Sequence, residues 1–240
     1  MSTPAEPGSG GSAGGGPGTG APGWRESVAA AFAWRYVAHS AMVAIALVNE
    51  ARPSPGPLHD PVLAVLPRIE WIAAHNYHLW LALYVPLALW LWAKDRRTFV
   101  RFLWVGGWLS LVRGVCILAT GLGPVDGVDR NAGMTAAGMV AAWWGIVNPI
   151  SALTTDVAHV SLTKDLFFSG HAATTFLLWL YARPWRRLAA AAMAAHVVVV
   201  ASVFLAHLHY TIDVAGAWAI TAVVWSVAER RAGRRQNSPA

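Results

Sequence analysis

Two histidines and an aspartate have types and spacing that could support nucleophilic and acid–base chemistry. His209 and Asp213 are four residues apart in the stretch HLHYTIDV, so on a helix they share one face. A carboxylate in that position takes the Nδ1 proton of the imidazole and leaves Nε2 free as a nucleophile or base. His171 follows Ser169 and Gly170 in DLFFSGH, at the start of an apolar run. A helix N-terminus that begins with a glycine presents N–H groups to a phosphate and lets it approach closely.

Each of these motifs also has a structural interpretation. Ser169 could cap a helix, with His171 as a polar residue at a membrane interface. Asp213 could cap the next helix in the same way and leave His209 at the interface. His207 lies two residues from His209, so we expect it to face elsewhere and to have no role in the chemistry. The chemical interpretation therefore depends on whether the fold brings the two motifs together.

A charged residue inside an apolar run is a third candidate. Arg113 lies near the middle of the run at residues 102–122, where an unpaired guanidinium is costly in hydrocarbon. It could hold a phosphate through two parallel hydrogen bonds, or form a structural ion pair with Asp165 or another carboxylate. Arg35 lies similarly within the run at 27–48. The sequence leaves both alternatives for Arg113 open.

The composition places these residues in a membrane. Of 240 residues, 56% are hydrophobic and 12% are charged, whereas soluble domains are about one quarter charged. This excludes an ordinary soluble domain. The single cysteine, Cys116, excludes an internal disulfide framework and a cysteine-rich metal site. The net charge of +6 does not indicate nucleic-acid binding, because the basic residues stand between apolar runs.

Apolar runs of sufficient length predict an all-α polytopic membrane protein with six transmembrane helices. A helix needs about 20 residues to cross a bilayer. The predicted spans are residues 27–48, 71–92, 102–122, 166–182, 188–206 and 210–228. They form one membrane domain at 24–232, between a disordered Gly/Pro/Ser-rich tail at 1–23 and a cytoplasmic tail at 233–240.

The basic residues predict the orientation of these spans. With the N-terminus in the cytoplasm, the outer loops hold Arg52, Arg68, Arg130 and Lys164. The inner segments hold the remaining clusters, Lys94, Arg96, Arg97, Arg101, Arg183, Arg186, Arg187, Arg230, Arg231, Arg234 and Arg235. This asymmetry obeys the positive-inside rule. A seventh span at 133–150 would place the last two basic clusters on the outer side of the membrane. We therefore interpret 123–165 as an outer loop with an interfacial or re-entrant helix. Both histidine motifs then lie at one depth on the outer side, which is periplasmic or lumenal.

The two motifs resemble those of the type-2 phosphatidic acid phosphatase superfamily, and more closely those of its sphingomyelin synthase branch. The branch motif Asp-x-x-x-Ser-Gly-His is matched by Asp165, Ser169, Gly170 and His171. The motif His-Tyr-Thr-x-Asp-Val is matched by His209, Tyr210, Thr211, Asp213 and Val214. The likeness extends over roughly residues 50–228.

Other family motifs match in part. A Pro-Leu-Pro-Asp motif appears as Pro57-Leu58-His59-Asp60. An arginine-rich motif keeps Arg101, Arg113 and Thr120 but departs at Val100 and Ser110. Phosphatases of the superfamily usually carry Ser-Arg seven and six residues before the second histidine, where this chain has Ser202 and Val203. The missing arginine favours the synthase branch.

The resemblance implies transfer of a phospho-head group without a cofactor or a metal. His209 would attack the phosphorus of a phospholipid, and Asp213 would orient it. His171 would protonate the departing diacylglycerol and then activate the hydroxyl of ceramide or a similar acceptor. Further contacts to the substrate would come from Asp165, Ser169, Gly170, Arg113, Tyr210 and Thr211. His75 and His78 form the nearest approach to a metal-binding pair, and we expect them to be polar lining.

Three functions stay open at this point. The first is a lipid phosphotransferase of the sphingomyelin synthase type, and the second is a lipid phosphate phosphatase, in which water is the acceptor. The third is a non-catalytic transporter or scaffold whose buried charges relay protons or substrate. In each case the partners are the bilayer and its lipids, with phospholipid and ceramide-like or diacylglycerol substrates for the enzymes, and no nucleic acid.

Overall fold

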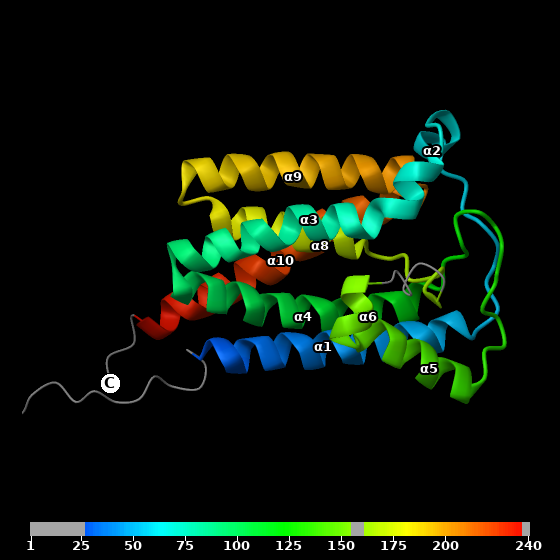
Figure 1. Ribbon diagram of the computed structural model, residues 1–240, viewed down its shortest axis with the longest axis horizontal. Helices are drawn as coiled ribbons and strands as arrows, with labels where there is room; N and C mark the ends of the chain where they lie inside the picture. Colours follow the sequence, from blue (N-terminus) through cyan, green and yellow to red (C-terminus); the bar gives the residue numbers. More distant parts are fainter. Residues whose placement is uncertain (1–26, 155–160, 237–240) are drawn as a thin grey trace, which may run out of the picture.

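The computed structural model describes residues 27–154 and 161–236, and all regular elements within them are helices (Figure 1). The expected disordered tail at 1–23 lies outside the described residues. Of the expected tail at 233–240, residues 233–236 continue the last helix and the rest lie outside the described part.

Helices occupy all six predicted spans, with ends shifted by up to eight residues. In chain order the helices are α1 (Val28–Glu50), α2 (Pro61–Val65), α3 (Glu70–Lys94), α4 (Arg96–Thr120), α5 (Ala136–Val147), α6 (Pro149–Thr154), α8 (Gly170–Ala182), α9 (Arg186–Leu205) and α10 (Thr211–Gln236). The segment expected to hold an interfacial or re-entrant helix contains α5 and α6, and α5 packs against α1.

Four of these helices are long and apolar enough to cross a membrane, as expected of a multi-pass membrane protein. They are α1, α4, α9 and α10, the last over Thr211–Gly233. Helix α3 has 25 residues, but His75, Asn76 and His78 interrupt its apolar character. Helix α8 has 13 residues, which is about 20 Å at 1.5 Å per residue and short of a hydrocarbon core of about 30 Å. Six membrane crossings therefore stay a prediction.

Two adjacent glycines let α1 and α4 pack closely, and this is the most extensive helix pair of the bundle. A Cβ added to Gly107 would lie 2.2 Å from Nε1 of Trp34. That indole donates a hydrogen bond to the carbonyl of Trp104 at 3.0 Å and stacks on its ring. Gly106 similarly faces the side chain of Arg35. The small residues thus bring a tryptophan and an arginine of α1 against the backbone of α4.

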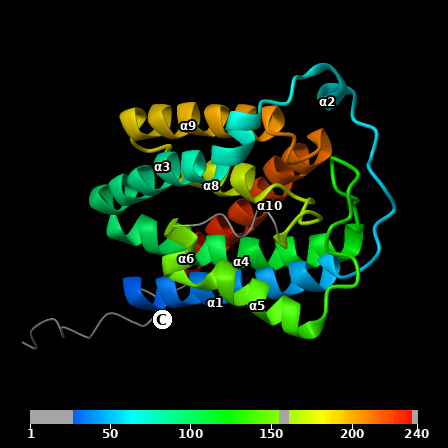
Figure 2. The ribbon, with the colours of Figure 1, turned by 45° about the vertical axis from the view of Figure 1, so that its right-hand side comes forward.

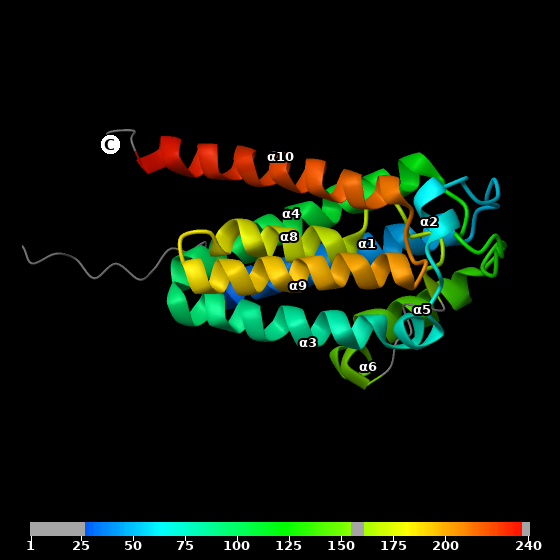
Figure 3. The same ribbon diagram turned by 90° about the horizontal axis from the view of Figure 1, so that it is seen from above.

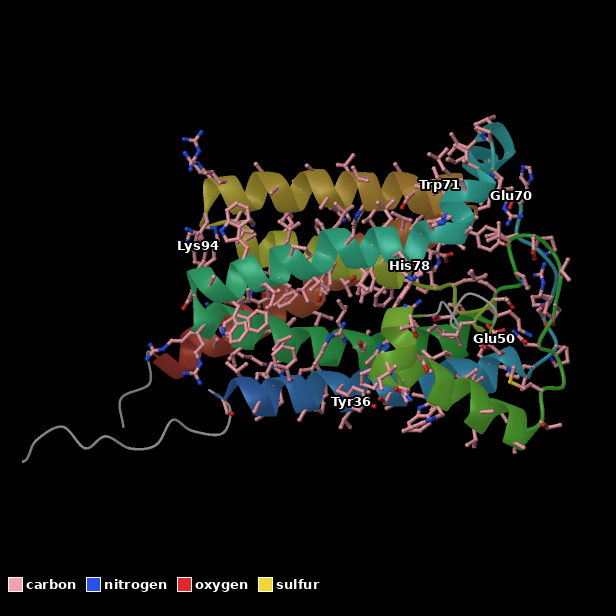
Figure 4. All side chains as sticks on the ribbon, in the orientation of Figure 1. Tyr36, Glu50, Glu70, Trp71, His78 and Lys94 are labelled. Atoms are coloured by element: carbon pink, nitrogen blue, oxygen red, sulfur yellow. The ribbon has the colours of Figure 1, made fainter. Side chains whose placement is uncertain are left out.

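Helix α8 lies among four of the long helices and packs against α3, α4, α9 and α10 (Figures 1 and 3). The turns between α3 and α4 and between α8 and α9 lie at one end, which we call the basic end; it carries Lys94, Arg96, Arg97, Arg183, Arg186 and Arg187. Figure 4 shows Lys94 there and Glu50 and Glu70 at the opposite end. That opposite end, the loop end, holds α2 and the segments at 51–69 and 121–135 (Figure 2). The gathering of basic residues at one end agrees with the predicted topology, while the side of the membrane that each end faces stays a prediction.

Candidate active site

A cavity of about 640 Å³ reaches from the loop end into the bundle, and both motif histidines line it. Its walls come from α1, α3, α4, α5, the start of α8 and the turn before α10. The polar side chains on these walls include Arg35, His39, Asn76, Arg113, Asp165, His171 and His209. The fold thus meets the condition that the sequence left open, because residues 38 positions apart in the chain share one hollow.

Asp213 holds both His209 and the first turn of α10. Its Oδ2 lies 3.5 Å from Nδ1 of His209, an ion-pair distance, and accepts a hydrogen bond from the Tyr210 N–H at 2.8 Å. Asp213 is fully buried, whereas His209 is 6% exposed and that surface faces the cavity. Because Nδ1 faces the carboxylate, Nε2 is the nitrogen left for chemistry.

The turn that delivers His209 is built by the end of α9. His207 has a left-handed backbone with φ of 52°, and the Leu208 N–H bonds back to the carbonyl of Val203 at 3.1 Å. This arrangement ends a helix sharply. The His207 ring contacts the carbonyl of Leu66 at 3.1 Å. His207 nevertheless lines the same cavity as His209, so the expectation that it faces elsewhere is wrong, and its lack of a role in the chemistry stays a prediction.

The two motifs are joined through the backbone. The Ser169 N–H donates to the carbonyl of Asp213 at 3.1 Å, so α8 and α10 begin side by side. Ser169 also caps α8 by accepting from the Ala172 N–H at 3.4 Å, and it is fully buried outside the cavity wall. His171, in the first turn of α8, lines the same cavity as His209.

Arg113 clamps the loop that leads into α8. Its Nε donates to the carbonyl of Phe168 at 2.6 Å, and its Nη2 donates to the carbonyl of Asp165 at 3.1 Å. The same Nη2 forms an ion pair with Oδ1 of Asp165 at 2.9 Å. The structural pair is therefore present. Because the guanidinium also lines the cavity, contact with a phosphate stays a prediction for both residues.

Gly170 leaves room where the guanidinium crosses the start of α8. A Cβ at this position would lie 3.1 Å from Cζ of Arg113. The glycine therefore lets Arg113 reach the loop at 165–168, and its backbone lines the cavity next to His171.

Tyr210 and Thr211, which the sequence places among the substrate contacts, anchor the site from behind. The Tyr210 hydroxyl accepts from the Leu58 N–H at 2.9 Å and donates to the carbonyl of Gly123 at 3.0 Å. Thr211 donates to Asp60 from its N–H at 2.5 Å and from its hydroxyl at 3.0 Å. Neither side chain lines the cavity, so they hold His209 in place from outside it, and a direct contact with substrate stays untested.

Asp60 caps two helices at once. Besides Thr211 at the start of α10, it accepts from the N–H groups of Val62 and Leu63 at the start of α2, at 2.9 and 3.3 Å. Burial opposes ionisation of Asp60, but these hydrogen bonds outweigh it and hold the pKa of the carboxyl below its usual value. The Pro57–Asp60 motif is thereby tied to the second histidine motif.

Several cavity residues were not assigned from the sequence. Trp80 packs edge-on against His171, with ring centroids 5.3 Å apart, and donates to the Thr174 hydroxyl at 3.2 Å. Arg35 and His39 line the cavity from α1. The charge of Arg35 within an apolar run was the one available signal, because its neighbours on α4 are about 70 residues away in the chain.

His75 and His78 were expected to be polar lining, and neither lines this cavity. The Nδ1 atom of His75 lies 2.8 Å from the carbonyl of Trp71, one turn earlier in the exposed first part of α3. Across residues 27–154 and 161–236, no three His, Cys, Asp or Glu side chains are grouped so that they could hold a metal ion.

Comparison with known families finds a match to part of the chain. Residues 164–230, which hold both histidine motifs, match the family model described as PAP2 superfamily C-terminal. This family contains sphingomyelin synthase-like proteins, and the partial match suggests the activity of a membrane lipid phosphatase or phosphotransferase. No curated protein matches the chain.

Proposed function

We propose that the protein is a membrane phosphotransferase that moves a phospho-head group from a glycerophospholipid to ceramide or a similar lipid alcohol. The observation that carries the proposal is the shared cavity of His171 and His209, with Asp213 behind His209. The family match over residues 164–230 supports chemistry on a lipid phosphate.

The first step breaks the bond between phosphorus and the diacylglycerol oxygen. Nε2 of His209 attacks the phosphorus and forms a P–N bond, and Asp213 stabilises the positive charge that develops on the ring. His171 donates a proton to the departing oxygen, so diacylglycerol leaves as a neutral alcohol. Arg113, already held by Asp165 beside Gly170, offsets negative charge on the phosphoryl oxygens.

The second step returns both histidines to their starting state. His171 takes the proton of the acceptor hydroxyl, and the oxygen attacks the phosphorus while the bond to Nε2 of His209 breaks. The new lipid carries the head group, and the enzyme is again free. Water in place of the lipid alcohol would give hydrolysis by the same route.

The walls of the cavity favour a lipid alcohol over water. Opposite the histidines, α1 and α5 contribute apolar side chains, among them Met42, Val43, Ile146 and Val147. Tyr36, on the outer face of α1 (Figure 4), ties α1 to the end of α5 through a hydrogen bond to the Val147 carbonyl at 3.1 Å. We propose that this apolar wall accommodates acyl chains and excludes water from the reacting phosphorus.

The proposal is tested by lipid mass spectrometry on membranes that contain ceramide, mixed phospholipids and either the wild type or His209→Ala. His75→Ala is the matched control, because this histidine lies outside the cavity. We expect a new phospho-head-group ceramide with the wild type and the control, and none with His209→Ala. Release of free phosphate or free head group without a new lipid would identify a phosphatase instead. Identical lipid profiles for all three folded proteins would leave a transporter or a scaffold.

A further inference from the structure

Arg35 is a cation inside α1 that the proposed chemistry does not use. Its Nη1 donates to the carbonyl of Gly106 at 2.8 Å and to the hydroxyl of Ser110, and its guanidinium also interacts with the Tyr84 side chain. All three partners are neutral groups. Arginine stays protonated in proteins, and an uncompensated charge within a membrane span is costly.

The other arginines on the cavity wall each have a carboxylate partner. Arg113 is paired with Asp165 at 2.9 Å. At the mouth, Nη1 of Arg130 lies 2.7 Å from Oδ2 of Asp126. Nη2 of Arg68 lies 3.3 Å from Oε2 of Glu70. Within the described part of the chain, Arg35 is the cavity arginine that no carboxylate neutralises.

His39 lies between Arg35 and Met42 on α1. Arg35, His39 and Met42 are spaced so that they share one face of α1, and all three line the cavity. The Met42 sulfur lies 3.4 Å from Nη1 of Arg113. Arg35 is seven residues earlier, which is about 10 Å along the helix. From the histidines toward the basic end, the cavity is therefore lined on α1 by Met42, then His39, then Arg35. The last of these is a cation without a carboxylate partner.

We infer that the Arg35–His39 end of the cavity binds a second negatively charged group of the lipid head group, either a carboxylate or a phosphate other than the one that reacts. An acyl chain would gain nothing from a guanidinium and an imidazole, and a neutral head group would leave the charge of Arg35 uncompensated. A negative group would satisfy it through charge-assisted hydrogen bonds. The inference rests on the proposed function in that it takes the reacting phosphoryl group to lie at His209.

Two matched pairs of lipids distinguish the two chemical sources. Phosphatidylserine and phosphatidylethanolamine differ by one carboxylate, and phosphatidylinositol 4-phosphate and phosphatidylinositol differ by one phosphate. We would reconstitute His209→Ala in nanodiscs with an equimolar pair, wash the protein in detergent, and determine the ratio of retained lipids by native mass spectrometry. His209→Ala cannot turn lipid over, so a bound preference is measured even if the lipid transfer assay is negative.

In at least one pair we expect the lipid with the additional carboxylate or phosphate to be retained roughly tenfold over its partner. One charge-assisted hydrogen bond would give a preference of this size. Adding Arg35→Gln should bring that ratio to about one, while Arg35→Lys, which keeps the charge, should preserve most of it. Arg101→Gln is the control for lipid bound at the surface, because Arg101 is paired with Glu229 and does not line the cavity. Equal retention of both lipids by His209→Ala in both pairs would overturn the inference. So would a ratio that Arg35→Gln leaves unchanged, or one that Arg35→Lys abolishes as fully as Arg35→Gln does.

Discussion

At the residue scale, the proposed mechanism depends on a carboxylate that is buried and does not line the cavity. Asp213 faces Nδ1 of His209 at 3.5 Å, and its other contacts hold the first turn of α10 and the start of α8. Its proposed roles are to fix the orientation of the imidazole and to stabilise its positive charge. A variant that keeps the shape and removes the charge separates these roles from simple packing.

We therefore predict that Asp213→Asn lowers the rate of transfer by roughly a hundredfold or more with little change in melting temperature. The amide oxygen can still accept the hydrogen bond from the Tyr210 N–H, so the fold of the turn is kept. The measurement is the turnover number in detergent, with Asp126→Asn at the cavity mouth as the control. An unchanged turnover number for Asp213→Asn would show that His209 works without its carboxylate.

The local parts of this site could be predicted from the sequence. The His209–Asp213 pair and the cap at Ser169 depend on residues close in the chain, and both contacts are present in the structure. His209, however, lies in the turn before α10 and not on the helix itself. Which side chains face the cavity depends on contacts between helices far apart in the chain. Tyr210 and Thr211 stand within the same motif as His209, yet they bind to segments about 87 and 151 residues away. The sequence gives no direct sign of such pairing, so both were expected at the substrate.

At the element scale, the closeness of α1 and α4 positions both Arg35 and Arg113. Gly107 faces the indole of Trp34, which is itself fixed between the rings of Trp104 and Trp108. A methyl group there has no flexible neighbour that could move aside.

Gly107→Ala should therefore destabilise the protein by about 1–3 kcal/mol, as overpacking of a filled interior does. The matched control is Gly233→Ala in α10, where an added Cβ meets nothing within 4 Å; alanine should be neutral or stabilise there by up to about 1 kcal/mol. Melting temperatures in the same detergent compare the two. Equal effects of the two substitutions would mean that α1 and α4 are not packed through this glycine.

Asp60 gives a second prediction at this scale, because it joins the starts of α2 and α10. Its pKa in the folded protein lies below the ordinary value for aspartate, about 3.9. Its contribution to stability is thus complete above that value and is lost as the pH falls through the lower, folded pKa. We expect Asp60→Asn to melt below the wild type at neutral pH, and the gap to shrink below about pH 4. A gap that stays constant or widens on acidification would contradict the proposed double cap.

The extent of the helices was only partly predictable. Apolar length located every long helix, because burial in lipid requires a continuous apolar run. The start of α8 was placed four residues early, since Leu166, Phe167 and Phe168 are as apolar as a helix interior but belong to the loop clamped by Arg113. Periodicity and hydropathy describe neighbouring residues, so they cannot predict a hydrogen bond from Arg113 to a carbonyl more than 50 positions away.

At the scale of the whole molecule, the predicted topology puts the loop end outside and the basic end in the cytoplasm. Because the chain has a single cysteine, the topology can be tested by labelling cysteines introduced at chosen positions. In a Cys116→Ser background, Val128→Cys places a thiol at the loop end and Arg183→Cys places one in the turn between α8 and α9; both positions are exposed.

We expect a membrane-impermeant maleimide to label the protein with Cys at 128 on intact cells, and the protein with Cys at 183 only after permeabilisation. The reason is that the positive-inside rule keeps arginine-rich turns in the cytoplasm. Labelling of both proteins on intact cells would mean that the two ends are on one side, and the reverse pattern would put the site in the cytoplasm.

The most direct test of the account is to detect the covalent intermediate on His209. Wild-type protein would be mixed with a phospholipid in the absence of acceptor, stopped at early times, digested and sequenced by mass spectrometry. We expect that the peptide with His209 gains the mass of the phospho-head group, that diacylglycerol appears in equal amount, and that adding an acceptor lipid removes the adduct. Turnover of lipid with no adduct on His209, or with the adduct on His171 instead, would contradict the assignment of His209 as the nucleophile.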